Sequence, residues 1–354
     1  SLTTDQIKEK FKDTKFNVID SGVEHGTVTL VSDQLKLELT TLRKDIKTDG
    51  RHAEIEYTDD WKKDSERRDF TINAIYLDIN GKVFDPQSGT EDLKNCNIKF
   101  IGDPQKRIEE DYLRIIRFIR FSLEYESEIE ETTIQAVRLN LDGIKKISKE
   151  RILTELFKIL RTKNFVKLNK NKHLKAIFLL IFPELKNLER LNQLEKISNR
   201  LNFDKEILLA VLLIDETNSH EYFSHKYNIS NNLKDNLSLI AKNFINFQKN
   251  KNFFLKDLKK NTYFFGKNHL MALNILSFSS GRKEKLKDYL TILNNINKIQ
   301  IPKLPFNGDY LKAKGMKEGA LIGKTLKIIE DEWLDNNFEI SDEKLLKIIK
   351  SQNN

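Results

Sequence analysis

The hydrophobic period of this chain changes once, near residue 104, and this change constrains the fold more than any other feature. Before it, short β-type runs alternate with turn signals, at residues 26–31, 35–42, 71–77 and 82–84. Asn80-Gly81, between the last two runs, is a strong hairpin signal. After it, apolar residues recur at helical spacing almost to the end. The sequence therefore predicts an α+β protein, with a small mixed head of antiparallel-type strands and helices followed by a long all-helical body.

Two apolar runs in the helical part, residues 176–182 and 207–214, are well short of the roughly 20 residues that span a bilayer. They predict core helices, so we expect no membrane partner. A late irregular stretch with Pro302 and Pro305 precedes a final helix from about Thr325. No internal repeat and no true linker is visible.

The composition is that of a globular protein, with 39% hydrophobic and 32% charged residues among 354. Such a length favours two or more packed units. A single cysteine, Cys96, excludes an internal disulfide framework and a cysteine-cluster zinc site. No basic-then-apolar leader opens the chain, so we expect a reducing cytoplasm.

The formal net charge of +8 and a pI near 9.1 favour a polyanionic partner, because lysine and arginine displace counterions from phosphates. The alternative is a solvated basic surface, since the chain is rich in Lys, Asn and Ile throughout.

The densest cluster of polar residues is Arg67-Arg68-Asp69, followed by Phe70-Thr71-Ile72-Asn73-Ala74. Two guanidinium forks and a carboxylate at the start of an apolar run can hold phosphates and ribose hydroxyls. The alternative is a surface salt bridge at a strand start.

A second cluster contains Asp85-Pro86, Gly89 and Asp92. This pattern predicts a tight, rigid turn in which Asp92 caps the next element of the chain. We expect this segment to shape the head more than it touches substrate.

A third cluster comes after Gly102-Asp103-Pro104. On one helix, Arg107, Asp111 and Arg114 would form a charged stripe, with Arg117 and Arg120 further on. Because aspartate only accepts hydrogen bonds and arginine only donates them, a fixed pair can recognise a base edge. The alternative is ion pairing within a solvated helix face.

Together the three clusters resemble the bacterial-type (class II) CCA-adding tRNA nucleotidyltransferases and the related poly(A) polymerases. That family has R-R-D-x-T-x-N-A, D-P-x-x-G-x-x-D-L and G-D-P-x-x-R-x-x-E-D-x-L-R-x-x-R, and every defined position is present here. The resemblance extends upstream through residues 25–28 and 38–43 and downstream through 148–156, with a fainter match at 305–333.

The resemblance implies roles for single residues. Arg67, Arg68 and Asp69 would hold the ribose and phosphates, and Asp111 and Arg114 would act as a protein template for the base of CTP or ATP. Arg107 and Arg117 belong to the same nucleotide-binding set, and Glu150 and Arg151 would brace the pocket from the next helix.

The family also uses two Mg²⁺ ions, which lower the pKa of the primer 3′-hydroxyl and neutralise the triphosphate. Glu38 matches the third acidic residue of that metal site. The other ligands belong to a G-G-x-x-R-D segment and an Asp-x-Asp pair, and neither pattern occurs among these 354 residues. The resemblance places the Asp-x-Asp pair just before Ser1, so we expect a chain truncated at its amino end and inactive as given.

By the same resemblance we expect an elongated molecule with four regions. They are a nucleotidyltransferase head lacking its first strands at 1–100, a helical neck with the base-recognising motif at 101–165, a helical body at 166–270 and a tRNA-binding helical tail at 271–354.

The expected activity is transfer of CMP and AMP from CTP and ATP to the 3′ ends of tRNA. Three alternatives stay open: a poly(A) polymerase of the same family, a catalytically dead RNA-binding module, and a specialist that adds only A or only CC. None of the six histidines precedes an aspartate, which argues against an added phosphohydrolase activity. No oligomeric state can be inferred from the sequence.

Overall fold

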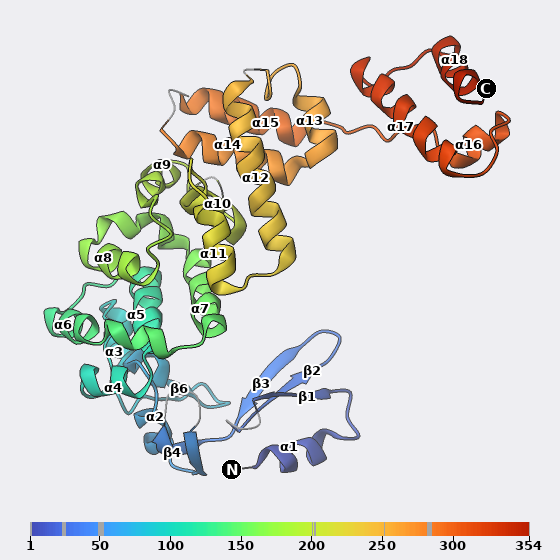
Figure 1. Cartoon of the computed structure of the whole chain (residues 1–354). Helices are drawn as coiled ribbons and strands as arrows, with labels where there is room; N and C mark the ends of the chain where they lie inside the picture. The colour runs from blue at the N-terminus through green and yellow to red at the C-terminus, as the bar shows by residue number, and fades with distance from the viewer. Residues whose placement is uncertain are drawn as a thin grey trace. The chain divides into compact units, whose positions relative to one another are not determined.

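The computed structural model describes residues 2–22, 26–48, 53–199, 201, 203–250, 252–281 and 285–353. The chain forms two compact units, Ser1–Lys234 and Asp235–Asn354 (Figure 1). The finer division at residues 100, 165 and 270 stays a prediction.

The head begins with α1 (Thr4–Phe11), which Thr3 and Gln6 cap by reciprocal hydrogen bonds. Five strands come next: β1 (Asn17–Gly22), β2 (Thr27–Val31), β3 (Lys36–Thr40), β4 (Arg43–Thr48) and β5 (Ala53–Tyr57). They form an antiparallel sheet of order β1-β2-β3 and a separate β4-β5 pair. In Figure 1, α1 lies beside the three-stranded sheet. The predicted antiparallel head is confirmed.

The run at residues 71–77 is mostly not a strand, and that part of the prediction was wrong. After α2 (Trp61–Glu66), residues Thr71–Ala74 form the 3₁₀ helix η2. The backbone N–H of Thr71 donates to the carbonyl of Lys99 at 3.0 Å, which ties this turn to a distant segment. The predicted hairpin is confirmed, because β6 (Tyr76–Leu77) pairs with β7 (Val83–Phe84) around Asn80-Gly81.

The second sequence cluster fastens α3 (Gly89–Lys94) to that turn. Asp85 accepts the backbone N–H groups of Gly89 and Thr90 at 2.8 Å each, so its carboxylate satisfies the first two N–H groups of the helix, whose N-cap residue is Ser88. A Cβ at Gly89 would lie 2.1 Å from the Thr71 carbonyl oxygen, which leaves room only for glycine. Asp92 does not act as a cap, contrary to prediction; its Oδ2 accepts the Thr71 hydroxyl at 2.8 Å.

The rest of the first unit is helical, as the period predicts. Its helices are α4 (Pro104–Glu110), α5 (Leu113–Glu124), α6 (Glu131–Leu139), η3 (Leu141–Lys146), α7 (Lys149–Arg161), η4 (Lys163–Lys170), α8 (Lys172–Ile181), η5 (Leu188–Arg190), α9 (Leu191–Glu195), α10 (Lys205–Leu213) and α11 (Ser219–Tyr227). The two apolar runs form α8 and α10, whose inward faces are buried, as predicted.

The second unit is also helical. Its helices are α12 (Asn231–Lys249), which starts four residues before the unit does, α13 (Leu258–Phe265), α14 (Lys267–Ser279), α15 (Leu286–Lys298), α16 (Gly308–Ala313), α17 (Ala320–Asp335) and α18 (Asp342–Asn353). The single final helix predicted from Thr325 is thus two helices. Phe338, with φ of 71°, separates them, and its ring packs on Trp333 with centroids 4.8 Å apart.

Within the part of the chain that the structure describes, every helix is too short or too polar to cross a membrane.

Candidate nucleotide-binding site

The carboxylate of Asp64, in α2, is fully buried and accepts hydrogen bonds from two neighbouring arginines. Arg67 donates from Nε and Nη2 to Oδ1 at 2.9 and 2.7 Å. Arg68 donates from the same two nitrogens to Oδ2 at 3.2 and 3.0 Å. The Tyr76 hydroxyl donates to Oδ2 at 2.8 Å, and the backbone N–H of Arg43 donates to Oδ1 at 3.1 Å. One carboxylate therefore fixes both arginines of the first motif.

The electrostatics of this cluster keep Asp64 ionised. Burial by itself raises the pKa of the carboxyl, but the charges of Arg67 and Arg68 outweigh burial and hold that pKa below its ordinary value. Burial, together with the hydrogen bond to Asp64, raises the pKa of Tyr76 to about 12. Near neutral pH the tyrosine is a donor and the aspartate an acceptor.

The third motif does not form one helical stripe, so that prediction was wrong. α4 ends at Glu110, Asp111 has an extended backbone with φ of −153° and ψ of 104°, and α5 begins at Leu113. Arg107 therefore lies on α4 and Arg114 on α5. Asp111 lies between the two helices, outside both.

Contacts with residues far along the chain stabilise this break. Arg151, in the first turn of α7, donates from Nη2 to Asp111 Oδ2 at 2.7 Å, and the N–H of Leu113 donates to Oδ1 at 3.1 Å. The ring of Tyr112 lies against Gly143, where an added Cβ would be 2.0 Å from the ring. Asp111 is thus held at a fixed place by α7 and η3 together.

Glu110 joins the two arginines that the break separates. Its Oε2 accepts Arg114 Nη1 at 2.6 Å and also pairs with Arg107. Arg114 donates further to the carbonyls of Arg107 at 2.7 Å and Arg67 at 3.4 Å, and Arg107 donates to the carbonyl of Arg68. Arg107 and Arg114 therefore hold the backbone of Arg67 and Arg68.

Asp69 is buried and contacts Arg117 in α5. Its Oδ2 accepts Arg117 Nε at 2.5 Å, and its Oδ1 accepts Asn73 at 2.9 Å and the N–H of Phe70 at 3.0 Å. Burial raises the pKa of Asp69, but Arg117 outweighs burial and lowers the pKa overall. In this structure the Asp69 carboxylate is engaged within the chain, and the role in ribose binding stays a prediction.

Glu155 on α7 is a further buried carboxylate near Arg117. Its side chain is 3% exposed and accepts Arg120 Nε at 3.0 Å and Lys158 Nζ at 2.7 Å, with Arg117 Nη1 at 3.8 Å. Arg117 therefore lies between the buried carboxylates of Asp69 and Glu155. This arrangement ties η2 of the head to α5 and α7.

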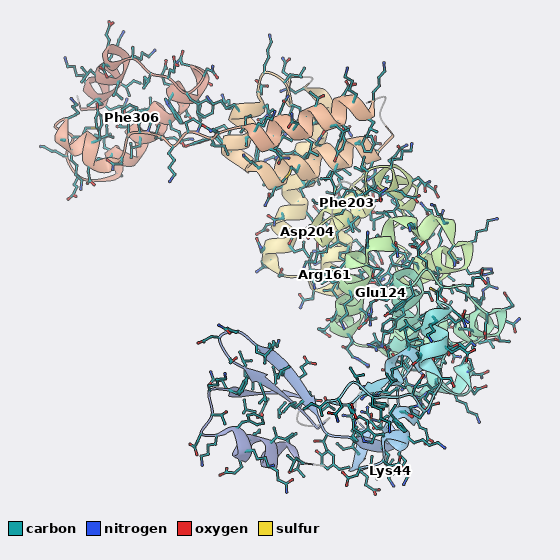
Figure 2. All side chains as sticks on the ribbon, turned by 180° about the vertical axis from the view of Figure 1, so that it is seen from behind. Lys44, Glu124, Arg161, Phe203, Asp204 and Phe306 are labelled. Carbon is teal, nitrogen blue, oxygen red and sulfur yellow. The ribbon has the colours of Figure 1, made fainter. Side chains whose placement is uncertain are left out.

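A cavity of about 450 Å³ lies beside these arginines. Its lining contains four cationic and three acidic side chains and one apolar one: Lys44, Lys63, Arg67, Arg107, Asp45, Glu66, Glu110 and Ile46. Lys44, labelled in Figure 2, comes from β4 and pairs with Glu56 at 2.8 Å. Arg67 of the first motif and Arg107 and Glu110 of the third motif all line this cavity.

The metal-site prediction rests on Glu38 alone. Glu38 is exposed on β3, opposite Thr29 of β2. Among the described residues, no three His, Cys, Asp or Glu side chains lie together in a way that could hold a metal ion. Since Mg²⁺ takes an octahedral shell of oxygen ligands, Glu38 by itself does not make its site. Glu150 is exposed in the first turn of α7, where its charge favours the helix amino end.

The sequence interpretation missed several residues of this site. Asp64 precedes the arginine pair by three and four residues, the spacing of ion pairs on a helix, and that signal could have found it. Glu110 was part of the quoted motif without a role. Lys44 and Lys63 had no signal, because β4 and α2 meet only in the folded head.

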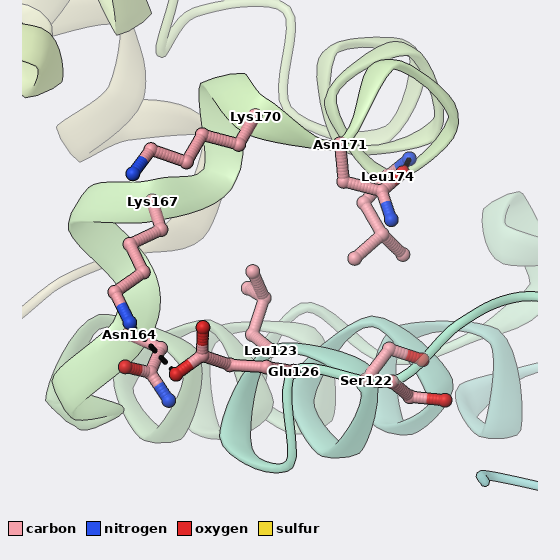
Figure 3. Close-up of a pocket in the computed structure, with 9 residues that line it drawn as sticks. Ser122, Leu123, Glu126, Asn164, Lys167, Lys170, Asn171 and Leu174 are labelled. Carbon is pink, nitrogen blue, oxygen red and sulfur yellow. Dashed lines mark hydrogen bonds and ion pairs between the residues drawn. The ribbon is translucent and has the colours of Figure 1, made fainter. Parts of the chain in front are cut away.

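A second cavity, of about 220 Å³, contains none of the motif residues (Figure 3). Ser122, Leu123, Glu126, Ser127, Asn164, Lys167, Lys170, Asn171 and Leu174 line it. Its two lysines are paired, Lys167 with Glu126 at 2.7 Å and Lys170 with Glu195. The arginine-lined cavity, which contains Arg67, Arg107 and Glu110 of the motifs, is therefore the candidate site.

The chain is similar to known proteins along nearly its whole length. It is 31% identical to the mitochondrial CCA tRNA nucleotidyltransferase 1 of Mus musculus, over 99% of this chain and 81% of that protein. This chain belongs to the CCA-adding enzyme and poly(A) polymerase family of nucleotidyltransferases. The CCA-adding enzyme of Lactobacillus helveticus is 28% identical, over 99% of this chain and 87% of its own length.

Two segments match family models directly. Residues 1–99 match the poly A polymerase head domain, and residues 128–188 match a segment described as the probable RNA and SrmB-binding site of polymerase A. Glu38 and the Arg67-Arg68-Asp69 motif lie in the first match, and Arg151 and Glu155 lie in the second. The neck arginines lie between the two.

Solved structures of this nucleotidyltransferase family share the fold. The Bacillus stearothermophilus CCA-adding enzyme in complex with CTP superposes with a TM-score of 0.64 at 20% identity, over 95% of this chain and 84% of that one. The Thermotoga maritima CCA-adding enzyme complexed with tRNA has a TM-score of 0.59 at 24% identity, over 98% and 83%. The expected fold of a small antiparallel head with a helical remainder is confirmed.

Proposed function

We propose that this protein adds CMP and AMP to tRNA 3′ ends, using CTP and ATP and no nucleic-acid template. The observation that supports this most is Asp111, which Arg151 holds outside both helices and whose carbonyl accepts the backbone N–H of Arg114 at 3.0 Å. The preceding residue, Glu110, lines the arginine-lined cavity. The near full-length similarity to CCA tRNA nucleotidyltransferases supports the same reaction.

Base selection follows from the hydrogen-bonding capacity of Asp111 and Arg114. Cytosine and adenine both present an amino donor next to a ring-nitrogen acceptor, whereas uracil and guanine present the reverse order. A carboxylate beside a guanidinium complements the first pattern. Arg114 uses Nη1 and Nη2 within the chain and keeps its Nε–H, and each Asp111 oxygen accepts one bond and has a further lone pair.

The triphosphate is assigned to Arg67 and Arg68. Arg67 lines the cavity together with Lys44, Lys63 and Arg107. Guanidinium groups bind phosphate oxygens through paired N–H donors. Both arginines are oriented by Asp64, so the nucleotide meets donors that are already in place.

Nucleotidyltransferases of this family generally use a divalent metal ion, and we propose two Mg²⁺ for the reaction. Because Glu38 is the single expected ligand in this sequence, we also infer that these 354 residues by themselves transfer no nucleotide. Addition of CMP or AMP to tRNA by this polypeptide, purified away from host enzymes, would contradict that inference.

For tRNA, phosphate contacts are the proposed mode of binding. Residues 156–183 contain seven basic residues and no acidic one, at Lys158, Arg161, Lys163, Lys167, Lys170, Lys172 and Lys175. All of this stretch lies in the segment that matches the RNA-binding family model. We propose that the region after residue 165, including the tail, binds tRNA through charge and shape. A reducing compartment such as the cytoplasm fits Cys96, a free thiol.

Binding of the four ribonucleotides to the full chain tests the assignment. Isothermal titration should show CTP and ATP binding, with UTP and GTP weaker by about tenfold or more. The poly(A) polymerase alternative is favoured by the family match of residues 1–99, and it predicts binding of ATP but not of CTP. Equal binding of all four nucleotides would overturn both.

A further inference from the structure

The two guanidinium groups of the first motif contact Asp64 in the same way. Each uses its Nε and Nη2, and each faces one carboxylate oxygen. Among the described residues, these hydrogen bonds to Asp64 leave Nη1 of both arginines unused. One edge of each group is therefore anchored, and the Nη1 donors stay available to a ligand.

The anchor itself is rigid because three elements hold it. Asp64 belongs to α2, the backbone of Arg43 in β4 donates to its Oδ1, and the hydroxyl of Tyr76 in β6 donates to its Oδ2. Arg67 Nε also donates to the carbonyl of Arg43 at 3.1 Å. The carboxylate cannot rotate without breaking contacts to two strands.

We propose that Asp64 is a positioning residue, which holds Arg67 and Arg68 side by side so that their Nη1 groups bind the triphosphate of the incoming nucleotide. The inference rests on the proposed function, in which these arginines bind the nucleotide. It assigns a role to a residue that the family motifs quoted above do not include.

Removing the Asp64 carboxylate should change the affinity for the triphosphate in opposite directions, depending on whether its charge or its positioning role dominates. A negative charge near a triphosphate site repels the ligand, so by Coulomb's law alone its loss should tighten binding. If Asp64 acts by orienting two cations, its loss should weaken binding although the site becomes more positive. The sign of the effect therefore distinguishes the two.

The test is titration of CTP into the full chain and into Asp64→Asn, both in EDTA so that metal ions do not contribute. Asp64→Asn should bind CTP about tenfold more weakly, the loss expected from misplaced charge-assisted hydrogen bonds. Asp60→Asn is the matched control, because Asp60 is an exposed carboxylate that caps the same helix, and asparagine caps equally well. It should bind CTP as the wild type does, or slightly more tightly.

Affinity for tRNA separates positioning from general damage. A merely structural loss in Asp64→Asn would weaken CTP and tRNA binding together. Positioning predicts weaker CTP binding with unchanged tRNA binding. Wild-type CTP affinity, or tighter binding, in a folded Asp64→Asn variant would overturn the proposal.

If Asp64→Asn does not fold, by circular dichroism, then Arg67→Lys and Arg68→Lys test the same idea. Lysine keeps the positive charge but has a single ammonium group. That group cannot contact Asp64 and the triphosphate at the same time, as the two edges of a guanidinium group can. Each should lose CTP affinity by a similar factor, and wild-type affinity in both would overturn the proposal. A wild-type chain that binds neither CTP nor ATP would instead refute the proposed function, and this inference with it.

Discussion

The two compact units differ in how they pair charges. Within residues 64–155, buried carboxylates are shared among arginines: the side chain of Asp64 is 0% exposed and that of Glu155 is 3% exposed. In Asp235–Asn354 lysines pair with exposed carboxylates, such as Lys260 with Asp335, whose side chain is 68% exposed. The sequence from residue 235 onward contains one arginine, Arg282, whereas 13 arginines precede it.

The difference separates buried charged groups, which fix the geometry of their neighbours, from exposed charged groups, which stay in contact with solvent. An exposed pair contributes little to stability, because solvent screens it and two long side chains lose freedom. A buried carboxylate costs desolvation, and the cost is recovered only in a fixed hydrogen-bonded geometry. Arginine suits the second case because its planar fork makes several bonds in one orientation. The network around Asp64, Asp69 and Glu155 uses mainly guanidinium groups, whereas exposed pairs such as Lys260 with Asp335 use lysine.

The largest expected effect comes from removing a shared carboxylate. Glu155→Ala leaves Arg120 and Arg117 without that partner in the interior, and should lower the free energy of unfolding by about 3–5 kcal/mol. Asp335→Ala, the control in the second unit, should change it by less than about 0.5 kcal/mol. Urea unfolding measures both free energies, and equal losses in the two variants would contradict the proposed difference between buried and exposed carboxylates.

A somewhat smaller effect is expected at Asp111 and Arg114, the pair proposed to recognise the base. Asp111→Ala or Arg114→Ala should lose discrimination against UTP and GTP more than affinity for the triphosphate, because an unpaired buried donor or acceptor costs about 1–3 kcal/mol. Titration of four nucleotides measures the ratios. If both variants reject UTP and GTP as the wild type does, the protein-template assignment is wrong.

Glycine-to-alanine changes should have opposite signs in the two units. Gly143→Ala would place its Cβ against the Tyr112 ring and should destabilise by about 1–3 kcal/mol. Gly323→Ala, in α17 with open space around it, should stabilise by up to about 1 kcal/mol. Thermal unfolding of both variants checks the signs, and a neutral Gly143→Ala would show that the contact with Tyr112 relaxes easily.

Acid should act on two kinds of buried group in different pH windows. Burial lowers the pKa of His269 from its ordinary 6.5 to about 4, so the unfolded chain binds the proton more readily. Stability from neutral His269 is complete above pH 6.5 and is lost as the pH falls toward 4, by about 1–2 kcal/mol after solvent screening. Asp64 and Asp69, whose pKa values are lowered, contribute stability that is lost only below their ordinary 3.8.

The variant that isolates the His269 effect is His269→Gln, which cannot charge and whose amide oxygen can still accept the hydrogen bond from Asn243. Unfolding free energies measured from pH 7 to pH 4 should fall less steeply in this variant. An unchanged slope would assign the pH dependence to other groups.

The smallest effect is expected from the tail. Residues 303–354 contain nine lysines and nine acidic residues, so their net charge is zero. Ending the chain before Lys303 should lower tRNA affinity and reduce the salt dependence only slightly, by the few phosphates that single lysines neutralise. Titration at several salt concentrations measures the log-log slope. Equal slopes for both chains would exclude the tail from tRNA binding.

Local patterns predicted what depends on local physics. The change of period, the core helices α8 and α10 and the hairpin at Asn80-Gly81 all depend on side chains close in sequence. The break at Asp111 does not, because it depends on Tyr112 meeting Gly143 and on Arg151. The turn at Thr71 likewise depends on the carbonyl of Lys99.

The candidate site shows the same limit. Its arginines were visible in the motifs, whereas Asp64, Glu110 and Glu155, which contact them, were given no role. Motif patterns identify groups that could meet a ligand. The buried acceptors behind such groups become apparent only when strands and helices are brought together, as Arg43 and Tyr76 are around Asp64.

The shared carboxylate of Asp64 also limits how this site can be re-engineered. Because both guanidinium groups rest on one anchor, a library that varies position 67 or 68 alone samples only side chains that fit the existing anchor. Altered nucleotide preference would have to be sought in combinatorial libraries that randomise positions 64, 67 and 68 together. In such a selection, single substitutions are expected to give no altered nucleotide preference. Variants with an altered preference should carry two or three substitutions among these positions.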